Sequence, residues 1–333
     1  MIDYFKLLEY FLYAFFFSLL VSPLVISIMK REKIKQTILH YVDSHKLKNG
    51  TPTMGGIIFL LSITIISLIC FEGKSGFARM TILLFLAYGI VGFLDDFIKF
   101  RFKRNLGLRP YQKIIFQLLV SVAAGFYVYK NMGGTILIPF TNKLVNIGWW
   151  IIPFVALIYL ATTNSVNLTD GLDGLASSTT LVYLLSFFVL MVIFISRGVI
   201  ASNVSNIEEY KNLSVVCVVA CGALLCFLLF NCFPAKIFMG DTGSLALGSL
   251  IASLSIFTGM ELYLPILGIV FVVSSVSVIL QVAYYKLTKK RIFLMAPLHH
   301  HFEKKGVHEV RITFGYSLVS LLVGVVVILI NIL

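Results

Sequence analysis

Two adjacent carboxylates, Asp95 and Asp96, end a long apolar run within the segment Gly92–Lys99. Charge next to such a run is costly to bury, so ionisable residues there are functional candidates by default. Neighbouring residues of a helix point about 100° apart. The two carboxylates therefore need not share a ligand, and one can hold a metal ion while the other handles a proton. The alternative is a solvated helix end with Lys99 as counter-charge.

A second polar segment, residues 164–174, contains Asn164, Asn167, Asp170 and Asp173 together with two glycines and no cation. Asn, Asp and Gly form tight turns whose backbone N–H groups can face a ligand. The ligand spacing and terminal Glu of an EF-hand are missing, so that type of calcium loop is excluded. A ligand-binding loop and a plain polar connector both remain open.

A third acidic position, Asp241, begins a further apolar run and follows Asn231, Phe238 and Gly240. Asp241 stands where a helix N-cap is expected, and capping is the ordinary interpretation. A helix N-terminus also suits a phosphate group or a metal ion bound by a carboxylate.

Three consecutive histidines, His299, His300 and His301, follow Pro297 and Leu298. Consecutive residues cannot all face one ion on regular backbone, and no Cys or acidic partner stands at zinc spacing. Phosphate binding or proton handling is favoured instead.

Basic residues gather in two segments, 46–56 and 99–113, which include Lys48, Lys99 and Lys113. Each segment suits phosphate groups, and the alternative is general attraction to lipid phosphates at a membrane surface.

The composition shows which elements must position these residues. The chain has 333 residues, of which 59% are hydrophobic and 13% are charged, against about 25% charged in ordinary domains. A soluble or disordered protein is excluded. The net charge of +12 fits the cations that membrane proteins carry in cytoplasmic loops, so we expect no nucleic-acid partner.

Ten nearly charge-free runs approach the length of about 20 residues that a membrane-spanning helix needs. A barrel would instead alternate in segments of about 10 residues. We therefore expect an all-α polytopic membrane protein with ten transmembrane helices in a single domain, 1–333. The third and fourth runs are short and should extend into their charged flanks. The runs are Tyr10–Met29, Met54–Phe71, Met80–Leu94, Ile114–Tyr129, Leu144–Thr163, Leu175–Ser196, Leu213–Asn231, Thr242–Met260, Leu262–Tyr285 and Ile312–Leu333.

The loops between these runs have unequal charge. The loops after the odd-numbered runs hold 20 of the 27 Lys and Arg residues. The positive-inside rule then places these loops in the cytoplasm and both termini on the outer side. All six histidines and the five aspartates named above fall on the inner face. Oxygen ligands of this kind suit Mg²⁺ bridging substrate phosphates, and no Walker A, G-x-S-x-G or H-E-x-x-H motif occurs. The pattern indicates a membrane enzyme that handles a phosphate with Mg²⁺ at a cytoplasmic cleft.

Five segments together carry a family resemblance: GTPTMGG at 50–56, GFLDDFIK at 92–99, NSVNLTDGLDGLA at 164–176, MGDTGSLALG at 239–248 and APLHHHFE at 296–303. The sequence resembles the phospho-N-acetylmuramoyl-pentapeptide transferases, within the polyprenyl-phosphate N-acetylhexosamine-1-phosphate transferase superfamily. The HHHFE form favours this branch over the relatives that use UDP-N-acetylglucosamine.

The resemblance implies a reaction, a place and partners. UDP-N-acetylmuramoyl-pentapeptide and undecaprenyl phosphate would give lipid I and UMP, with Mg²⁺ as cofactor, in the first membrane step of peptidoglycan biosynthesis. The enzyme would lie in the bilayer of the bacterial cytoplasmic membrane as a homodimer, with its active site facing the cytoplasm. Nucleoside natural products are expected as inhibitors.

The resemblance also implies residue roles. Asp241 corresponds to the Mg²⁺ ligand, with Asp96 as a second candidate ligand, and Asp95 corresponds to the base that deprotonates the lipid phosphate. The histidine triplet is implied in catalysis at the sugar phosphate. The implied substrate-binding residues are Lys48, Lys99, Lys113, Asn164, Asn167, Asp170, Asp173, Asn231, Phe238 and Gly240. Phe97 stands where the family commonly has Tyr.

Three alternatives stay open at this point. One is a sibling enzyme that transfers N-acetylglucosamine-1-phosphate from UDP-N-acetylglucosamine to the same lipid. Another is a lipid-phosphate or ion transporter, although transporters place charges near the midplane and often show inverted repeats. The third concerns chemistry: direct attack by the lipid phosphate is favoured over a two-step route through an aspartyl-phosphate.

Overall fold

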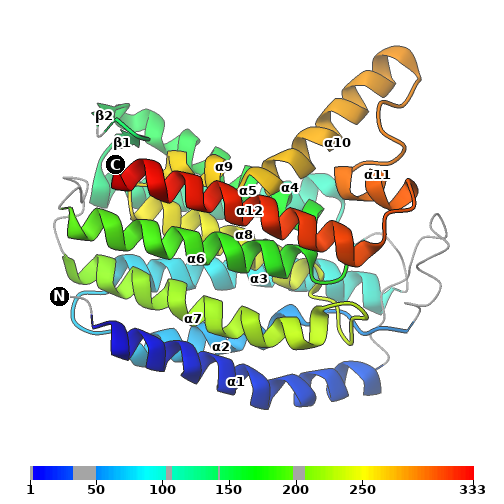
Figure 1. Ribbon diagram of the computed structural model, residues 1–333, viewed down its shortest axis with the longest axis horizontal. Coiled ribbons are helices and arrows are strands. Elements are labelled where there is room, and N and C mark those ends of the chain that lie inside the picture. Colours follow the sequence, from blue (N-terminus) through cyan, green and yellow to red (C-terminus); the bar gives the residue numbers. More distant parts are fainter. Residues whose placement is uncertain (1–2, 33–49, 103–106, 142, 198–206) are drawn as a thin grey trace.

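In a computed structural model of the protein, the described residues are 3–32, 50–102, 107–141, 143–197 and 207–333. These ranges are largely helical, and the long helices pack side by side in one bundle (Figure 1). The elements are α1 (Tyr4–Arg31), α2 (Gly56–Cys70), α3 (Gly76–Arg101), α4 (Pro110–Met132), β1 (Thr135–Ile138), β2 (Lys143–Asn146), η2 (Gly148–Trp150), α5 (Ile151–Thr169), α6 (Leu175–Ser196), α7 (Ile207–Asn231), α8 (Gly240–Phe257), η3 (Glu261–Tyr263), α9 (Leu264–Leu267), α10 (Ile269–Thr288), α11 (Leu298–Lys304) and α12 (Glu309–Ile332).

Within the described ranges, nine helices are long and apolar enough to cross a membrane. They correspond to nine of the ten predicted runs. The remaining run, Met54–Phe71, corresponds to α2, an apolar helix of 15 residues. These helices confirm the prediction of a polytopic helical protein. Helices suit this environment because a backbone within lipid must satisfy its hydrogen bonds inside each segment.

Two predicted runs extend as expected, and two others differ from the observed elements. The third and fourth runs do extend into their charged flanks, as α3 and α4. Leu144, predicted to begin a span, lies in β2, which pairs antiparallel with β1. The chain is therefore not strictly all-α. The predicted span Leu262–Tyr285 is interrupted at Gly268, between α9 and α10.

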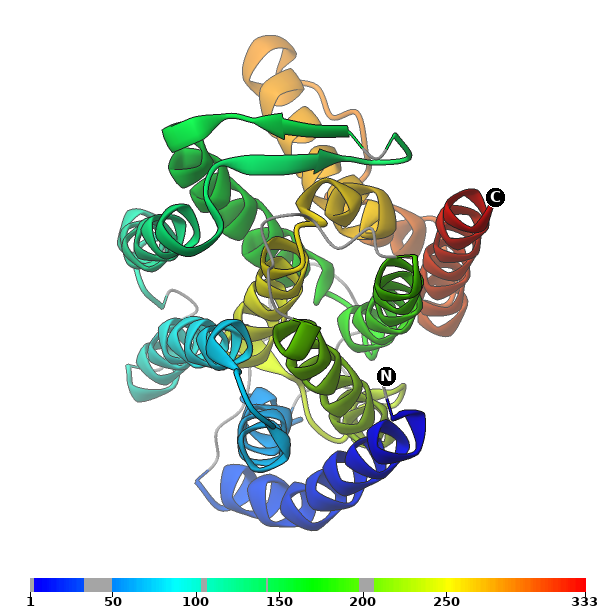
Figure 2. The same ribbon diagram turned by 90° about the vertical axis from the view of Figure 1, so that its left-hand side faces the viewer.

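Helix α8 forms the centre of the bundle. Every residue from Thr242 to Phe257 is buried, and Figure 2 shows α8, in yellow, surrounded by the other helices. Its sequence is rich in Gly, Ala and Ser, which allow helices in membranes to approach closely. The approach is closest at Gly92 of α3, where an added Cβ would lie 2.1 Å from the carbonyl oxygen of Asp241. Helices α3 and α8 therefore pack in close backbone contact beside the acidic residues.

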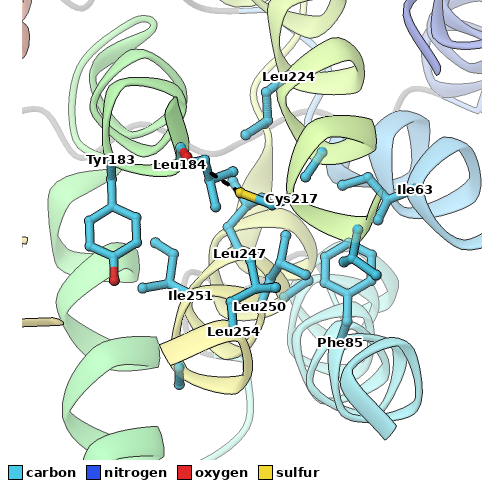
Figure 3. Close-up of a cluster of buried hydrophobic side chains, with 14 of the residues drawn as sticks. Ile63, Phe85, Tyr183, Leu184, Cys217, Leu224, Leu247, Leu250, Ile251 and Leu254 are labelled. Atoms are coloured by element: carbon cyan, nitrogen blue, oxygen red, sulfur yellow. Dashed lines mark hydrogen bonds between the residues drawn. The ribbon is translucent and has the colours of Figure 1, made fainter. Parts of the chain in front are cut away.

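The apolar core surrounds this central helix. Figure 3 shows Leu247, Leu250, Ile251 and Leu254 of α8 among side chains from α2, α3, α6 and α7. Within this cluster the Cys217 thiol donates a hydrogen bond to the Leu184 carbonyl oxygen at 3.3 Å. The buried core makes the positions of the helix ends well defined, and the functional side chains sit at those ends.

The two ends of the bundle differ. Both chain termini lie at one end, whereas α11 lies near the other (Figure 1). Helix α10 leaves the bundle at an angle and carries the chain out to α11. The histidine segment thus lies far from the termini.

Candidate active site

Three aspartates converge where α3 ends and α8 begins. Asp95 and Asp96 lie in the last two turns of α3, and Asp241 lies in the first turn of α8. Each offers a carboxylate oxygen, and these oxygens all lie within 4.8 Å of one another. Asp95 and Asp96 are only 3% and 5% exposed. A cluster of carboxylate oxygens is the donor set that Mg²⁺ prefers.

Asp241 is held by three side chains from three other helices. Its Oδ2 accepts from the ammonium groups of Lys99 at 3.0 Å and Lys113 at 2.9 Å. Its Oδ1 accepts from the side-chain amide of Asn167 at 2.8 Å, and the same amide also donates to Ser244 Oγ. Asp241 was predicted at the N-cap, but it lies one residue inside α8, whose first residue is Gly240. Its carboxylate therefore faces neighbouring helices rather than its own backbone.

Asp96 takes over the capping role. It accepts hydrogen bonds from Asp241 N at 3.2 Å, Thr242 N at 2.9 Å and Thr242 Oγ1 at 2.7 Å. The free N–H groups of the first helical turn are thus satisfied from outside the helix. Gly240 makes this possible, because it has a φ of +72° and an added Cβ would lie 2.5 Å from Asp96 Oδ2. Gly240 is therefore a structural part of the site.

Asp95 connects the cluster to the basic segment that follows α3. It pairs with Lys99 Nζ at 2.6 Å and accepts from the backbone N–H of Leu108 at 2.8 Å. Lys99 also lies 3.9 Å from Asp96 Oδ1. Lys99 thus contacts all three carboxylates, and it shares Asp241 with Lys113. Three carboxylates thus contact only two ammonium groups. The charge balance of the cluster therefore favours a further cation.

Asp170, which directly follows α5, lies within the influence of the same negative charges. Burial raises the pKa of Asp170 well above its usual value, and the negative charges of Asp241, Asp96 and Asp173 raise it further. Low-dielectric surroundings and like charges both favour the neutral carboxyl group. A cation bound near Asp241 would lower this pKa again.

Asn164 and Asn231, two further predicted residues, stabilise the surrounding helices and loops. Asn164 donates to Gln117 Oε1 on α4 at 2.8 Å. Asn231 accepts from Ser177 Oγ at 2.6 Å and donates to the Ile237 carbonyl oxygen at 3.0 Å. These two side chains position the helices and the loop before α8, and their hydrogen bonds go to groups outside the acidic cluster.

Asp173 connects three segments. Its backbone N–H donates to Glu309 Oε1 at 2.5 Å, and its Oδ2 accepts from Ala235 N at 2.9 Å. It thereby joins the loop after α5 to the start of α12 and to the loop before α8.

Phe238 is placed by its backbone. Its N–H donates to the Pro52 carbonyl oxygen at 2.9 Å, and its own carbonyl accepts from Gly55 N at 2.8 Å. These bonds join the segment before α2 to the segment before α8. Lys48 lies outside the described residues.

The histidine triplet lies on α11 and faces the loop after α5. An added Cβ on Gly171 would lie 2.4 Å from His299 Nε2 and 2.9 Å from His300 Nε2. His299 is fully buried, and burial lowers its pKa to about 3. His301 Nδ1 instead accepts from Leu294 N at 3.1 Å. Two of the three rings thus reach the loop that carries Asp170 and Gly171.

Sequence reasoning missed the residues that support the acidic cluster. Thr242 and Ser244 bind Asp96 and Asn167, and Glu309 binds the Asp173 backbone. Thr242 and Ser244 belong to the same MGDTGS stretch as Asp241, so their spacing on one helix turn was an available signal. Glu309 stands at the start of the last helix, and nothing in its local sequence marks it.

Comparisons with known proteins cover most of the chain. Residues 77–259 match the model for glycosyl transferase family 4, and residues 48–60 match phospho-N-acetylmuramoyl-pentapeptide-transferase signature 1. The chain is similar to three curated proteins named phospho-N-acetylmuramoyl-pentapeptide-transferase. That of Clostridium botulinum (strain Alaska E43 / Type E3) is 44% identical over 95% of this chain and 93% of its own length. That of Clostridium beijerinckii is 44% identical over 96% and 95%, and that of Desulfitobacterium hafniense is 44% identical over 94% and 93%.

Proposed function

Because the chain belongs to the phospho-N-acetylmuramoyl-pentapeptide-transferase family, within glycosyl transferase family 4, we propose that it transfers phospho-N-acetylmuramoyl-pentapeptide from UDP-N-acetylmuramoyl-pentapeptide to undecaprenyl phosphate. The products are lipid I and UMP, and the reaction serves peptidoglycan synthesis. The observation that carries the proposal is Asp241, held by Lys99, Lys113 and Asn167 beside two further carboxylates. Transfer of a phosphoryl group depends mainly on positioning and charge stabilisation, and this cluster supplies both.

Mg²⁺ fits the residues present. Asp241 would hold it, with Asp95 and Asp96 oxygens within 4.8 Å of one another as further donors. When bound, Mg²⁺ supplies positive charge to the diphosphate oxygens and the UMP leaving group. The three carboxylates support this assignment, because their oxygens are the donors that Mg²⁺ prefers and they outnumber the two lysines that contact them.

The residues of the chain then orient the two substrates. An oxygen of the lipid phosphate attacks the phosphorus attached to the sugar, and the bond from that phosphorus to the UMP oxygen breaks. Asp95 accepts the last proton of the lipid phosphate. Lys99 and Lys113 hold phosphate oxygens close to Asp241. A phospho-glycan trapped covalently on Asp95 or Asp96 would contradict direct attack and favour the two-step route.

The remaining predicted residues surround this centre. Asn167 and Asp170 line the nucleotide side, together with Phe238, Gly240 and Lys48. His299, His300 and His301 contact the sugar phosphate. Asn164, Asp173 and Asn231, proposed earlier as substrate contacts, serve the site by positioning its loops, as their hydrogen bonds indicate.

The protein is proposed to be one domain with ten transmembrane helices in the bacterial cytoplasmic membrane. The acidic cluster is proposed to face the cytoplasm and both termini to face outward, because 20 of the 27 Lys and Arg residues fall in the sequence segments that follow the odd-numbered apolar runs. A homodimer and inhibition by nucleoside natural products follow from the family resemblance.

The test is UMP release by purified protein in detergent with undecaprenyl phosphate, Mg²⁺ and UDP-N-acetylmuramoyl-pentapeptide. We expect release that Asp241→Asn and EDTA each abolish, and that added Mg²⁺ restores after EDTA. A parallel reaction contains UDP-N-acetylglucosamine. Release only from that substrate would assign the sibling activity, and no release from either by folded protein would favour a transporter.

A further inference from the structure

The three consecutive histidines of α11 have three different surroundings. The buried His299 ring lies with its centroid 6.3 Å from that of Tyr316. His301 accepts from a backbone N–H of the preceding loop. Among the contacts that the described residues show, His300 is the one paired with a carboxylate: its Nδ1 lies 2.9 Å from Glu303 Oε2. A residue without any assigned role therefore contacts the middle histidine directly.

The pair is well placed to act as a unit. Glu303 follows His300 by three positions, so the two side chains lie on the same face of α11. The side chains are 14% and 9% exposed, so bulk water competes little for the contact. Hydrogen bonds between an imidazole N–H and a carboxylate are short and directional. Because an ionised carboxylate only accepts, the contact holds a proton on Nδ1 and fixes the plane of the ring.

The opposite edge of the same ring faces the substrate side. His300 Nε2 would lie 2.9 Å from a Cβ added to Gly171. Gly171 directly follows Asp170, whose pKa is raised in part by the charges of Asp241 and Asp96. Asn167, in the last turn of α5 just before this loop, is bonded to Asp241. The ring is therefore held by Glu303 at Nδ1, and its Nε2 lies beside Gly171, the residue after Asp170.

We propose that Glu303 is a positioning residue for the transfer reaction, in which its carboxylate orients the His300 ring so that Nε2 points at the loop beside the substrate phosphates. The inference rests on the proposed function, because it assigns a role within that same site. In the alternative, Glu303 merely stabilises α11. The two differ in what the loss of Glu303 does once His300 is absent.

The experiment starts with Glu303→Gln, which keeps the size of the side chain and removes its charge. We expect kcat for UMP release to fall about 10–100-fold, as when outer partners of functional histidines are removed. KM for the nucleotide substrate and the thermal midpoint should stay close to those of the unchanged protein. Lys305→Gln, an exposed neighbour at the end of α11, is the matched control and should leave kcat unchanged. Glu303→Asp keeps the charge and should recover part of kcat, and it replaces the Gln variant if that variant is unstable.

A double-mutant cycle decides between positioning and stabilisation. In a His300→Gln background, Glu303→Gln should cause no further loss of kcat. Losses that multiply, or a fall in kcat that follows the thermal midpoint, would overturn the proposal. Active unchanged protein with a fully active Glu303→Gln variant would overturn it while leaving the proposed function intact. No UMP release by the unchanged protein would overturn the proposed function and the role of Glu303 with it.

Discussion

In the described part of the chain, the N-termini of α3 and α8 are each capped by a carboxylate from another helix, and these two caps lie at opposite ends of α3. At the start of α3, Glu209 of α7 accepts from Gly76 N and Phe77 N, each at 2.9 Å. At the start of α8, Asp96 of α3 accepts from Asp241 N and Thr242 N. Both carboxylates complete a helix end and complement its dipole.

The surroundings of the two caps differ. Near Glu209, the side chains of Glu208 and Asn212 bind backbone groups of the loop before α3. Around Asp96, by contrast, two more carboxylates and two lysines converge. Capping alone needs one carboxylate. The cap on α8 does not require the additional charges around Asp96, and burying such charges is costly without a partner. An excess of buried charge over structural need therefore distinguishes the functional end from the structural one.

The largest effect on activity is expected at Asp241, which caps neither α3 nor α8. Asp241→Asn removes the charge that Lys99 and Lys113 contact, and it should lower kcat for UMP release by about 10³-fold or more. The thermal midpoint should change little, because Asp241 does not cap α8. Comparable activity in this variant would place the metal and phosphate chemistry elsewhere and remove the distinction between the two ends.

Asp96→Asn should affect both activity and stability. It removes the charge and one acceptor from the three hydrogen bonds to the start of α8, which should destabilise the fold by about 1–3 kcal/mol. We also expect kcat to fall about 100-fold. Loss of the cap would displace the first turn of α8, and Asp241 lies in that turn. Thermal unfolding and UMP release measured on one preparation test this. An effect on stability alone would make Asp96 equivalent to Glu209.

Glu209→Gln should affect stability only. Loss of this cap should cost about 1 kcal/mol, within the usual range for cap removal, and leave UMP release unchanged. Thermal melts of this variant beside Asp96→Asn make the comparison direct. A marked loss of activity in Glu209→Gln would show that the two ends are coupled.

The smallest effect concerns pH and the buried His299. Because burial lowers its pKa to about 3, the folded protein keeps this ring neutral, whereas the unfolded chain takes up a proton below about pH 6.5. Stability should therefore fall as pH decreases, by about 1 kcal/mol between pH 6.5 and 5.5 from this group. Thermal midpoints across this range, compared with those of His299→Asn, measure the contribution. An equal slope in both proteins would contradict it.

Much of the fold was predictable because spanning helices require only length and apolar composition. The errors occurred where tertiary contacts decide. Residues 143–146 form a strand because they pair with 135–138, and an apolar run alone does not distinguish this from the start of a helix. The break at Gly268 leaves the apolar composition unchanged, and Pro265 and Gly268 were its only local signals.

The candidate site was predictable by residue type and less so by role. Asp95, Asp96, Asp241, Lys99, Lys113 and Asn167 do meet. Asn164 and Asn231 instead bind helices and loops. An asparagine that holds a backbone carbonyl and one that faces a carboxylate have the same local sequence signal, so only their neighbours in space separate them.

The sequence by itself determined that this is a polytopic membrane protein of the phospho-N-acetylmuramoyl-pentapeptide-transferase family, and which residue types are available for phosphate and metal chemistry. These properties depend on composition, span length and short motifs, which are local. The tertiary structure alone decided that Asp96 caps α8 and that Lys99 and Lys113 share one oxygen of Asp241. Such contacts depend on how closely α3, α4 and α8 pack and on the rotation of each helix about its axis. Both are set by the whole core rather than by any one segment.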